Sequence, residues 1–319
     1  MTSMTMNERA RTIADRMAAD AAGLRVAVHT LPGGARVIDA GVGIAGGLDA
    51  GLMLGEICMG GLGHVEYTVV TIGERNWPAV SVRTDHPAVS CMASQYAGWA
   101  ITVDKYFAMG SGPLRAQARV EKELFEKLHY AEQAGCGVLV LEGRALPTDD
   151  VAAWVARKAG LDPSQLTFVI APTASLAGGT QISARILETG LHKMETLGFD
   201  VRKILSGIGT APIATVAKND LRAIGRTNDC ILYGGQAHYT LDADDAELDR
   251  LARAVPASAS KDYGTPFYDI FERYDKDFYK IDPLLFSPAE VWLTSTRSGR
   301  TFHAGWMNPE VLEKSLYPG

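Results

Sequence analysis

The sequence predicts an α/β protein with two domains, each built on a mixed sheet, that meet in a cleft. Between about residues 114 and 235, helix and strand patterns alternate, as in sheets whose strands are joined by crossover helices. The first hundred residues and the end of the chain instead contain pairs of strand patterns joined by short turns, which indicate antiparallel strands. A length of 319 residues allows two domains of ordinary size.

The first third of the chain combines helices with hairpins. Periodicity and turn residues predict, in order, a helix over residues 7–22 capped by Asn7, two strands around the turn Leu31–Gly34, an apolar helix after the glycines of 41–47, strands over 65–72 and 79–85, and a helix over 88–97.

Alternating elements follow the glycine loop 110–113. They are a long amphipathic helix over 114–134, a buried strand over 137–143, a helix over 148–160, a buried strand over 166–172 and a helix over 180–194, with a late strand pair over 290–299 and 300–306. We place the domain boundary at the glycine loop. This gives an N-terminal α/β domain over 1–113 and a second α/β domain over 114–319, and leaves open a return of the last forty or so residues to the first domain.

Composition and charge exclude several classes of function. The formal net charge of −6 and the scattered charges provide no basic surface for nucleic acid or an anionic membrane. No run of ~18 apolar residues predicts a transmembrane helix, and the charged N-terminus lacks the apolar core of a signal peptide, so we expect a cytoplasmic protein. The four cysteines form no CxxC pair, and the seven histidines lack metal-ligand spacing, so neither a disulfide framework nor a metal site is predicted.

The helix predicted over 180–194 carries a polar column on the side opposite its apolar face. Arg185, Glu188 and His192 are spaced i, i+3 and i+7. One interpretation is a surface ion pair worth about 0.3–0.5 kcal/mol. The other is a ligand-facing pair, which is favoured by the preceding strand and glycines and by small neighbours, namely Ser183, Ala184 and Thr189. For His192 we expect a solvated or structural role.

Two glycine loops are candidate anion sites. Residues 41–46 match the dinucleotide fingerprint G-x-G-x-x-G, but the preceding strand belongs to a hairpin and the nearest acid, Glu66, begins a strand, so a tight turn is the favoured interpretation. Residues Gly110–Arg115 turn into a helix start, where free N–H groups and Arg115 could bind an anion or substrate oxygens. An ordinary helix start is the alternative for this second loop.

Several stretches together resemble one known family, the methenyltetrahydromethanopterin cyclohydrolases. They are GVGIAGGLDAGLMLGEICMGGLG, QYAGW, KYFAMGSGPLRA, APTASLAGGTQISARILETGLHKMETLGFD, GIGTAPIA and GRTNDCILYGG, in order over residues 41–235. The resemblance implies hydrolysis of the methenyl bridge of a reduced pterin one-carbon carrier to the formyl derivative, as in methanogenesis-type pathways or formaldehyde oxidation. It also implies no metal or redox cofactor, a cytoplasmic homotrimer, and two α/β domains around a large pocket.

The resemblance also implies which residues form the site. Its Arg-x-x-Glu pair falls on Arg185 and Glu188, with the acid as the catalytic group. A carboxylate suits this chemistry, because it can hold a water over the electrophilic carbon and take its proton. Substrate contacts are expected from Gln95, Tyr96, Gly110, Ser111, Gly112, Arg115, Gly178, Gly179, Arg226, Asn228, Asp229 and Tyr233.

Two of these expectations have qualifications. Tyr96 stands where we expect a lysine in archaeal relatives, so a role of that lysine does not transfer to this chain. Read without the resemblance, residues 225–235 predict a turn followed by a buried strand.

Two other functions remain open at this point. One is an NAD(P)-dependent oxidoreductase that acts on the same carrier and uses residues 41–46 for the nicotinamide cofactor. The other is a pterin-binding protein without catalytic activity.

Overall fold

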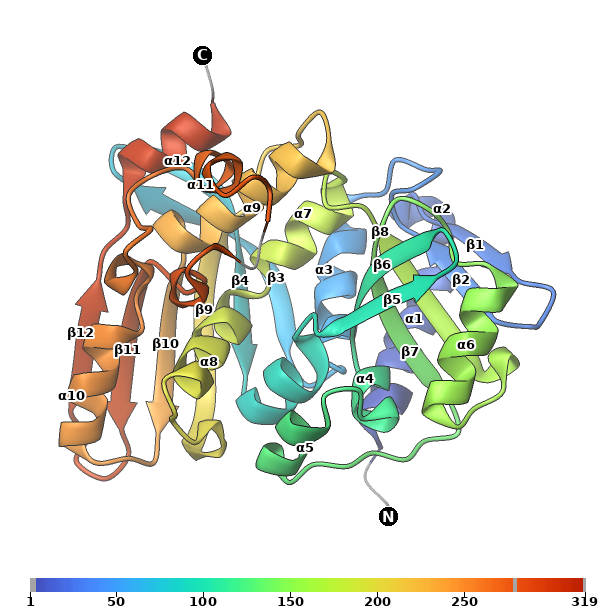
Figure 1. Ribbon diagram of the computed structural model, residues 1–319, viewed down its shortest axis with the longest axis horizontal. Coiled ribbons are helices and arrows are strands. Elements are labelled where there is room, and N and C mark those ends of the chain that lie inside the picture. The colour runs from blue at the N-terminus through green and yellow to red at the C-terminus, as the bar shows by residue number, and fades with distance from the viewer. Residues whose placement is uncertain (1–3, 278–279, 318–319) are drawn as a thin grey trace. The chain divides into compact units, whose positions relative to one another are not determined.

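The computed structural model describes residues 4–277 and 280–317, which form two compact units (Figure 1). Unit 1 comprises Met1–His64 and Val89–Gln181, and unit 2 comprises Val65–Ala88 and Ile182–Gly319. The predicted α/β class with mixed sheets is confirmed, because each unit contains one six-stranded sheet. The boundary expected after Pro113 falls inside unit 1, where strands on both sides of it pair in one sheet, and the last forty residues belong to unit 2.

The sheet of unit 1 has the strand order β1-β2-β8-β7-β6-β5. Its strands are β1 (Ala27–Thr30), β2 (Arg36–Asp39), β5 (Trp99–Val103), β6 (Tyr106–Ser111), β7 (Gly137–Glu142) and β8 (Leu166–Ala171). The three strands β2, β8 and β7 are parallel, whereas β1 and the β5–β6 hairpin pair antiparallel at the two edges. The predicted hairpin around Leu31–Gly34 and both predicted buried strands are therefore confirmed.

Helices cover both faces of this sheet, which explains why β7 and β8 are mostly apolar and are buried along nearly their whole length. The helices of unit 1 are α1 (Met6–Ala19), α2 (Ala21–Leu24), α3 (Leu48–Cys58), α4 (Leu114–Ala118), α5 (Lys122–Leu128), α6 (Asp149–Ala159) and most of α7 (Leu176–Ser183), with the π-helix η1 (Ala88–Gln95) and the 3-10 turn η2 (Pro163–Gln165). Leu139 and Leu141 pack with Val155 of α6, whereas Val138 and Val140 pack with the core of α1 and α3.

The N-terminus of α1 differs from its prediction. Thr5, not Asn7, caps the helix, and it forms a capping box with Glu8. Asn7 is buried, donates from Nδ2 to Glu132 Oε1 (2.6 Å), and accepts from the Val138 amide (2.8 Å). Asn7 therefore joins α1 to the loop before β7 and to the strand itself.

The prediction of one long helix over 114–134 is wrong. The segment forms two short helices, α4 and α5, which end at Arg119 and His129, both with φ near +50°. Beyond α5 the chain is irregular because Glu132 turns toward α1 and accepts from the Met6 amide (3.1 Å) and the Asn7 amide (2.8 Å). Glu132 thus accepts from amides in the first turn of α1, which have no partner within their own helix. A continuous helix over 114–134 would leave these amides without Glu132.

The sheet of unit 2 has the order β12-β11-β10-β9-β4-β3. Its strands are β3 (His64–Ile72), β4 (Arg75–Thr84), β9 (Ile204–Pro212), β10 (Gln236–Leu241), β11 (Glu290–Ser295) and β12 (Thr301–Gly305). The β10–β11 pair is parallel, whereas β4–β9, β9–β10 and β11–β12 are antiparallel. The late strand pair predicted from the sequence is thus confirmed as β11 and β12.

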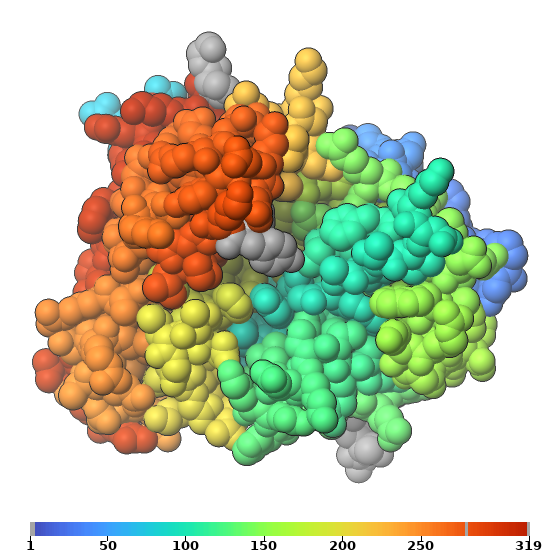
Figure 2. Space-filling model, in the orientation of Figure 1, coloured from blue at the N-terminus to red at the C-terminus, as the bar shows by residue number. Residues whose placement is uncertain are grey.

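Helices α8, α9 and α10 pack on the sheet of unit 2, and residues of α12 share a hydrophobic cluster with β3 and β4. The helical elements are α8 (Ile186–Thr196), α9 (Asp220–Gly234), α10 (Asp245–Ala254), α11 (Phe267–Arg273) and α12 (Pro309–Leu316), with the 3-10 turns η3 (Val201–Lys203), η4 (Ala257–Ala259) and η6 (Pro283–Leu285). In the space-filling view the side chains of α8, in yellow, and α10, in orange, lie in front of the strands (Figure 2). Helices α11 and α12 pack on α9.

Helix α9 replaces the turn and strand predicted over 225–235. Asn219 caps it by accepting from the Arg222 amide (3.0 Å). The helix contacts β9, α11 and α12, so its residues are covered from several directions. Residues Cys230–Gly234 at the end of the helix are all buried, and such an apolar run cannot be distinguished from a buried strand by periodicity.

The single helix predicted over 180–194 is two helices, α7 and α8. Gly178 and Gly179 do not precede the first helix but lie within it. The chain turns at Ala184 and Arg185, and Ser183 Oγ donates to the Pro212 carbonyl (2.8 Å) at this point. Arg185 consequently occupies the N-cap position of α8, with backbone angles of −83° and 6°.

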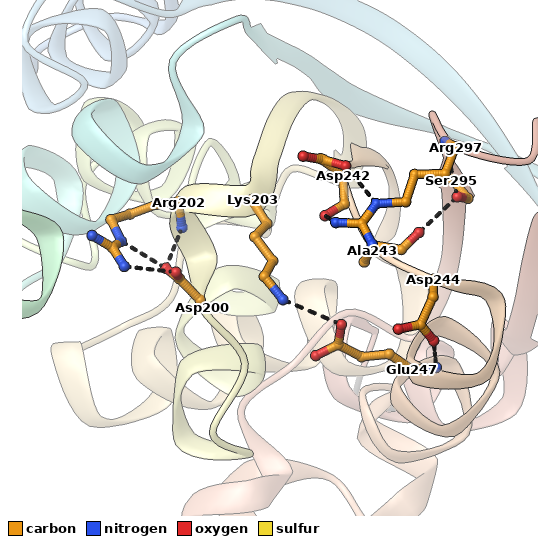
Figure 3. A network of polar contacts seen from close by, with 9 residues as sticks. All are labelled: Asp200, Arg202, Lys203, Asp242, Ala243, Asp244, Glu247, Ser295 and Arg297. Carbon is orange, nitrogen blue, oxygen red and sulfur yellow. Dashed lines mark hydrogen bonds and ion pairs between the residues drawn. The ribbon is translucent and has the colours of Figure 1, made fainter.

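A polar network joins three segments at one end of the sheet of unit 2 (Figure 3). Lys203 contacts Glu247 of α10 (3.3 Å), and Arg297 donates to Asp242 Oδ1 (2.7 Å). The other residues drawn are Asp200, Arg202, Ala243, Asp244 and Ser295. Its ion pairs are at least a quarter exposed, and such pairs contribute about 0–1 kcal/mol each. We therefore interpret the network as a surface connection between strand ends and α10.

Among the helices of residues 4–277 and 280–317, none combines the length and the apolar character needed to cross a membrane.

Gly178 should be intolerant of a side chain. A Cβ at this position would overlap the Pro172 carbonyl oxygen, which is backbone and cannot rotate away. We expect Gly178→Ala to lower the free energy of unfolding by about 1–3 kcal/mol, as overpacking does. Thermal and urea unfolding followed by circular dichroism would measure this.

Gly135→Ala is the matched control. No atom lies within 4 Å of a Cβ built at Gly135, so a change within about 0.5 kcal/mol is expected. Equal losses in the two variants would contradict the steric explanation.

Candidate active site

Arg185 and Glu188 form a buried ion pair at the start of α8. Their side chains are 9% and 7% exposed, and Arg185 Nη1 lies 3.9 Å from Glu188 Oε2. The interpretation as a surface ion pair is therefore wrong. The separation indicates a charge interaction rather than a direct hydrogen bond between these two atoms.

The helix start adds to the electrostatics of this pair. Because Arg185 is the N-cap, Glu188 is the third residue of α8 and lies in its first turn. The positive end of the helix dipole and the guanidinium both attract the carboxylate, whereas burial opposes its charge. The arrangement places an ionisable carboxylate beside a permanent positive charge in a largely buried position, which suits a carboxylate that accepts a proton.

Close packing against the sheet of unit 2 fixes the position of α8. A Cβ at Gly209 would lie 3.1 Å from Ile186, one at Gly235 would lie 2.5 Å from it, and one at Gly207 would lie 3.3 Å from Leu187. Gly207 and Gly209 of GIGTAP and Gly235 thus make room for the two residues that precede Glu188. Tyr239 of β10 adds a hydrogen bond from its hydroxyl to the Leu187 carbonyl (2.9 Å).

His192 lies one turn beyond Glu188 on α8 and is half-buried. One residue further, Lys193 is 1% exposed and donates to the Leu284 carbonyl of η6. Burial lowers the pKa of Lys193 to about 8, and the nearby Asp282 carboxylate opposes this shift. Lys193 thereby attaches the segment around η6 to the helix that carries Glu188.

The loop 41–46 is a tight turn whose amides are occupied by a carboxylate of the chain. Asp39 is 1% exposed and accepts from the amides of Gly41 (2.9 Å), Val42 (2.6 Å) and Gly43 (2.7 Å). A phosphate would need these same N–H groups and would be repelled by Asp39. The geometry supports the tight-turn interpretation over the dinucleotide site.

The second glycine loop is also engaged within the protein. The Gly112 amide donates to the Ser94 carbonyl (2.8 Å), and α4 behind it has only five residues. Arg115 is completely buried and contacts Glu121, Met92 and Ser94. This favours an ordinary helix start over an anion site. The expected substrate contacts of Gly110, Ser111 and Gly112 remain predictions, whereas the complete burial of Arg115 argues against the contact expected from it.

A buried polar cluster in unit 1 contains one predicted residue and others that the sequence reasoning missed. Cys58 Sγ lies 3.5 Å from Ser111 Oγ and 3.7 Å from Gln181 Oε1, and Ser94 Oγ donates to the Cys58 carbonyl (2.6 Å). Gln181 was detectable, because it is a polar residue in an otherwise small and apolar helix after Gly178-Gly179. The burial of Cys58 and Ser94 depends on strand order, which the sequence does not reveal.

Gln95 and Tyr96 follow each other at the end of η1. Gln95 is fully buried, Tyr96 is half-buried, and the Tyr96 amide donates to the Cys91 carbonyl (2.8 Å). Gly178 and Gly179 lie in α7, which approaches α3 so closely that a Cβ at Gly51 would lie 2.5 Å from Thr180. Packing therefore accounts for Gly178, and its substrate contact, like that of Gly179, is untested.

Three of the four predicted residues of α9 contact segments outside the helix, and Asn228 contacts the helix itself. Arg226 donates to the Val216 carbonyl (2.9 Å), and Asn228 donates to the Ile224 carbonyl (2.8 Å). Asp229 accepts from the Phe267 amide (2.8 Å), and the Tyr233 hydroxyl donates to the Thr265 carbonyl (2.7 Å). Burial raises the pKa of Asp229 to about 8 and also raises that of Tyr233. The contacts of Asp229 and Tyr233 anchor the start of α11, and substrate contacts of the four residues remain predictions.

Within the described part of the chain, no group of three or more His, Cys, Asp or Glu side chains is arranged to hold a metal ion. The four cysteines are free, and Cys58, Cys91 and Cys230 are buried.

Comparison with known proteins gives one consistent result. The family model described as Cyclohydrolase (MCH) matches residues 5–316. A methenyltetrahydromethanopterin cyclohydrolase of Methanococcoides burtonii is 41% identical over 314 residues, which are 98% of each chain. Proteins of the same name from Methylobacterium sp. (strain 4-46) and Methylobacillus flagellatus are 46% and 44% identical, over 98% of this chain and 97% and 95% of theirs. The chain belongs to the methenyltetrahydromethanopterin cyclohydrolase family, whose members are hydrolases that act on a carbon–nitrogen bond.

Proposed function

We propose that the chain hydrolyses the methenyl bridge of methenyl-tetrahydromethanopterin, or of a dephospho or other variant form, to the 5-formyl derivative, with Glu188 as general base and Arg185 as its partner. The observation that carries the assignment of roles is the buried Arg185–Glu188 pair at the N-terminus of α8. Family membership over nearly the whole chain supports the reaction.

Hydrolysis of the bridge consumes one water molecule and opens one carbon–nitrogen bond. The methenyl bridge is a resonance-stabilised cation with an electrophilic carbon between two nitrogens. Water attacks this carbon, a carbon–oxygen bond forms, and Glu188 takes one proton from the water. One carbon–nitrogen bond then breaks, and the departing nitrogen receives the proton held by Glu188. The new hydroxyl releases its proton to solvent as the formyl carbonyl forms, so one water is consumed and one proton is produced.

Arg185 has two roles in this proposal. Its charge compensates the buried carboxylate, because an unpaired buried charge is costly. It also restricts the carboxylate to one side of the helix start, which orients the proton acceptor. The negative charge of Glu188 itself also attracts the cationic substrate.

The remaining expectations belong to the same proposal and rest on the family resemblance. We propose a cytoplasmic homotrimer that binds a reduced pterin, uses no metal or redox cofactor, and serves one-carbon metabolism, with formaldehyde oxidation as one setting.

A direct assay of the reaction uses the near-ultraviolet absorbance of the methenyl chromophore. Adding the protein to methenyl-tetrahydromethanopterin should bleach it, and methenyl-tetrahydrofolate tested alongside shows whether the carrier is discriminated. Saturable binding of the carrier without bleaching would instead support the pterin-binding protein without catalytic activity.

Glu188→Gln should reduce kcat at least ~10²-fold, the low end of the loss expected when a general base is removed. The amide keeps the size of the side chain, so folding should persist. Glu195→Gln, a half-buried acid on the same helix, is the control and should keep the wild-type rate. A near-normal rate for Glu188→Gln would reject Glu188 as the base.

Arg185→Lys should slow turnover less than Arg185→Ala. Lysine keeps a positive charge near Glu188, whereas alanine leaves a buried carboxylate without this partner, which destabilises proteins by about 3–5 kcal/mol in other cases. Steady-state kinetics and thermal unfolding of both variants measure the two effects. Equal activity of the lysine and alanine variants would show that the charge of Arg185 is not used.

NAD(P) should not bind saturably to the wild-type chain, because Asp39 occupies the amides of the 41–46 loop. Titration calorimetry with NAD, NADP and their reduced forms checks this. Tight, saturable binding of any of them would favour the oxidoreductase instead.

A further inference from the structure

Arg115 is the largest side chain that the fold buries completely. A buried guanidinium needs a counter-charge and acceptors for its donors. Glu121 provides the counter-charge, since its Oε1 lies 2.8 Å from Nη2 and 3.1 Å from Nε of Arg115. The Glu121 side chain as a whole is 22% exposed, although its Oε2 is buried, so the pair extends from the interior toward the surface of unit 1.

The other edge of the guanidinium binds the end of the π-helix η1. Arg115 Nη1 donates to the carbonyls of Met92 (3.3 Å) and Ser94 (3.2 Å). Carbonyls in the last turn of a helix lack intrahelical donors, and a cation is favoured there. π-Helical turns are frequent at functional sites, and this one ends at Gln95-Tyr96.

The guanidinium of Arg115 lies over two aromatic rings. Its central carbon lies 5.1 Å from the centre of the Tyr96 ring and 5.8 Å from that of Phe125, within the ~6 Å range of cation–π contacts. One side chain thus contacts both the backbone just before Tyr96 and the ring of Tyr96.

Gly98 completes this arrangement. A Cβ at Gly98 would overlap the Glu121 carboxylate and lie 2.7 Å from the Tyr96 ring. The motif QYAGW and the motif GSGPLRA are therefore parts of one packed unit, in which the second supplies Arg115 and the first supplies the groups that it holds.

We propose that Arg115 is a positioning residue that sets the orientation of Gln95-Tyr96 for the pterin carrier and does not itself contact the carrier. Its complete burial and its contacts with Glu121, Met92 and Ser94 carry this inference. The contact between Tyr96 and the carrier rests on the proposed function, whereas the positioning of Tyr96 by Arg115 does not.

Arg115→Lys tests the proposal. Lysine keeps the charge but cannot reach Glu121 and two carbonyls in one plane or stack in the same way. The exposed Arg119, four residues further along, provides the matched control Arg119→Lys.

The first readout is amide hydrogen exchange, which needs no substrate. We expect the peptide over residues 92–98 to exchange about tenfold faster in Arg115→Lys and unchanged in Arg119→Lys, because local opening is governed by local contacts. Unchanged exchange in Arg115→Lys would overturn the proposal. If Arg115→Lys does not fold, Glu121→Gln is the second variant, because it weakens the same contact from the Glu121 side. It should speed exchange in the same peptide. No effect of Glu121→Gln on this peptide would equally overturn the proposal.

The second readout separates binding from chemistry. Arg115→Lys should raise KM about tenfold and change kcat less than about threefold, as expected when an interaction made equally in ground and transition states is lost. In a double-mutant cycle with Tyr96→Leu, the double variant should bind no worse than Tyr96→Leu alone. Additive losses would show that Arg115 contacts the carrier itself. A wild-type chain without turnover would refute the proposed function, and the exchange result would still decide the positioning role.

Discussion

The packing of helix α8 onto the sheet of unit 2 is the constraint on which the candidate active site depends. Ile186 and Leu187 pack against Gly207 and Gly209 of β9 and against Gly235, where an added Cβ would crowd them, and the Tyr239 hydroxyl donates to the Leu187 carbonyl. With those two residues held against the sheet, the neighbouring Arg185 and Glu188 are buried too. Two opposite charges that are buried together must pair, so the ion pair is a consequence of the packing as much as of the chemistry.

The glycine-rich motifs of this chain allow close packing of neighbouring segments more than they bind ligands. Gly41 and Gly43 donate to the buried Asp39, Gly178 lies against the Pro172 carbonyl, and Gly98 leaves space for Glu121. Their backbone groups and surroundings are already engaged inside the fold. A glycine pattern that resembles a phosphate loop is therefore compatible with a structural turn, and the partners of its amides distinguish the two.

Part of the fold could be predicted from the sequence, because some signals are local. The β1–β2 hairpin follows from its turn residues, and β7 and β8 follow from short apolar runs. The continuous helix over 114–134 was wrong because Glu132 is drawn to amides of α1, a contact 125 residues away in sequence. The candidate site was also only partly predictable. Residue spacing indicated the Arg185–Glu188 pair, but the burial of this pair depends on the sheet beneath α8.

The central claim is that an ionised Glu188 removes a proton from the attacking water. The pH dependence of kcat/KM, measured for the wild type and Glu188→Gln side by side, tests it most directly. A carboxylate base loses activity as it is protonated, so the wild-type rate should fall toward low pH along one titration limb. That limb should be absent in Glu188→Gln, which cannot titrate. The same limb in both proteins would contradict the assignment of Glu188 as the base.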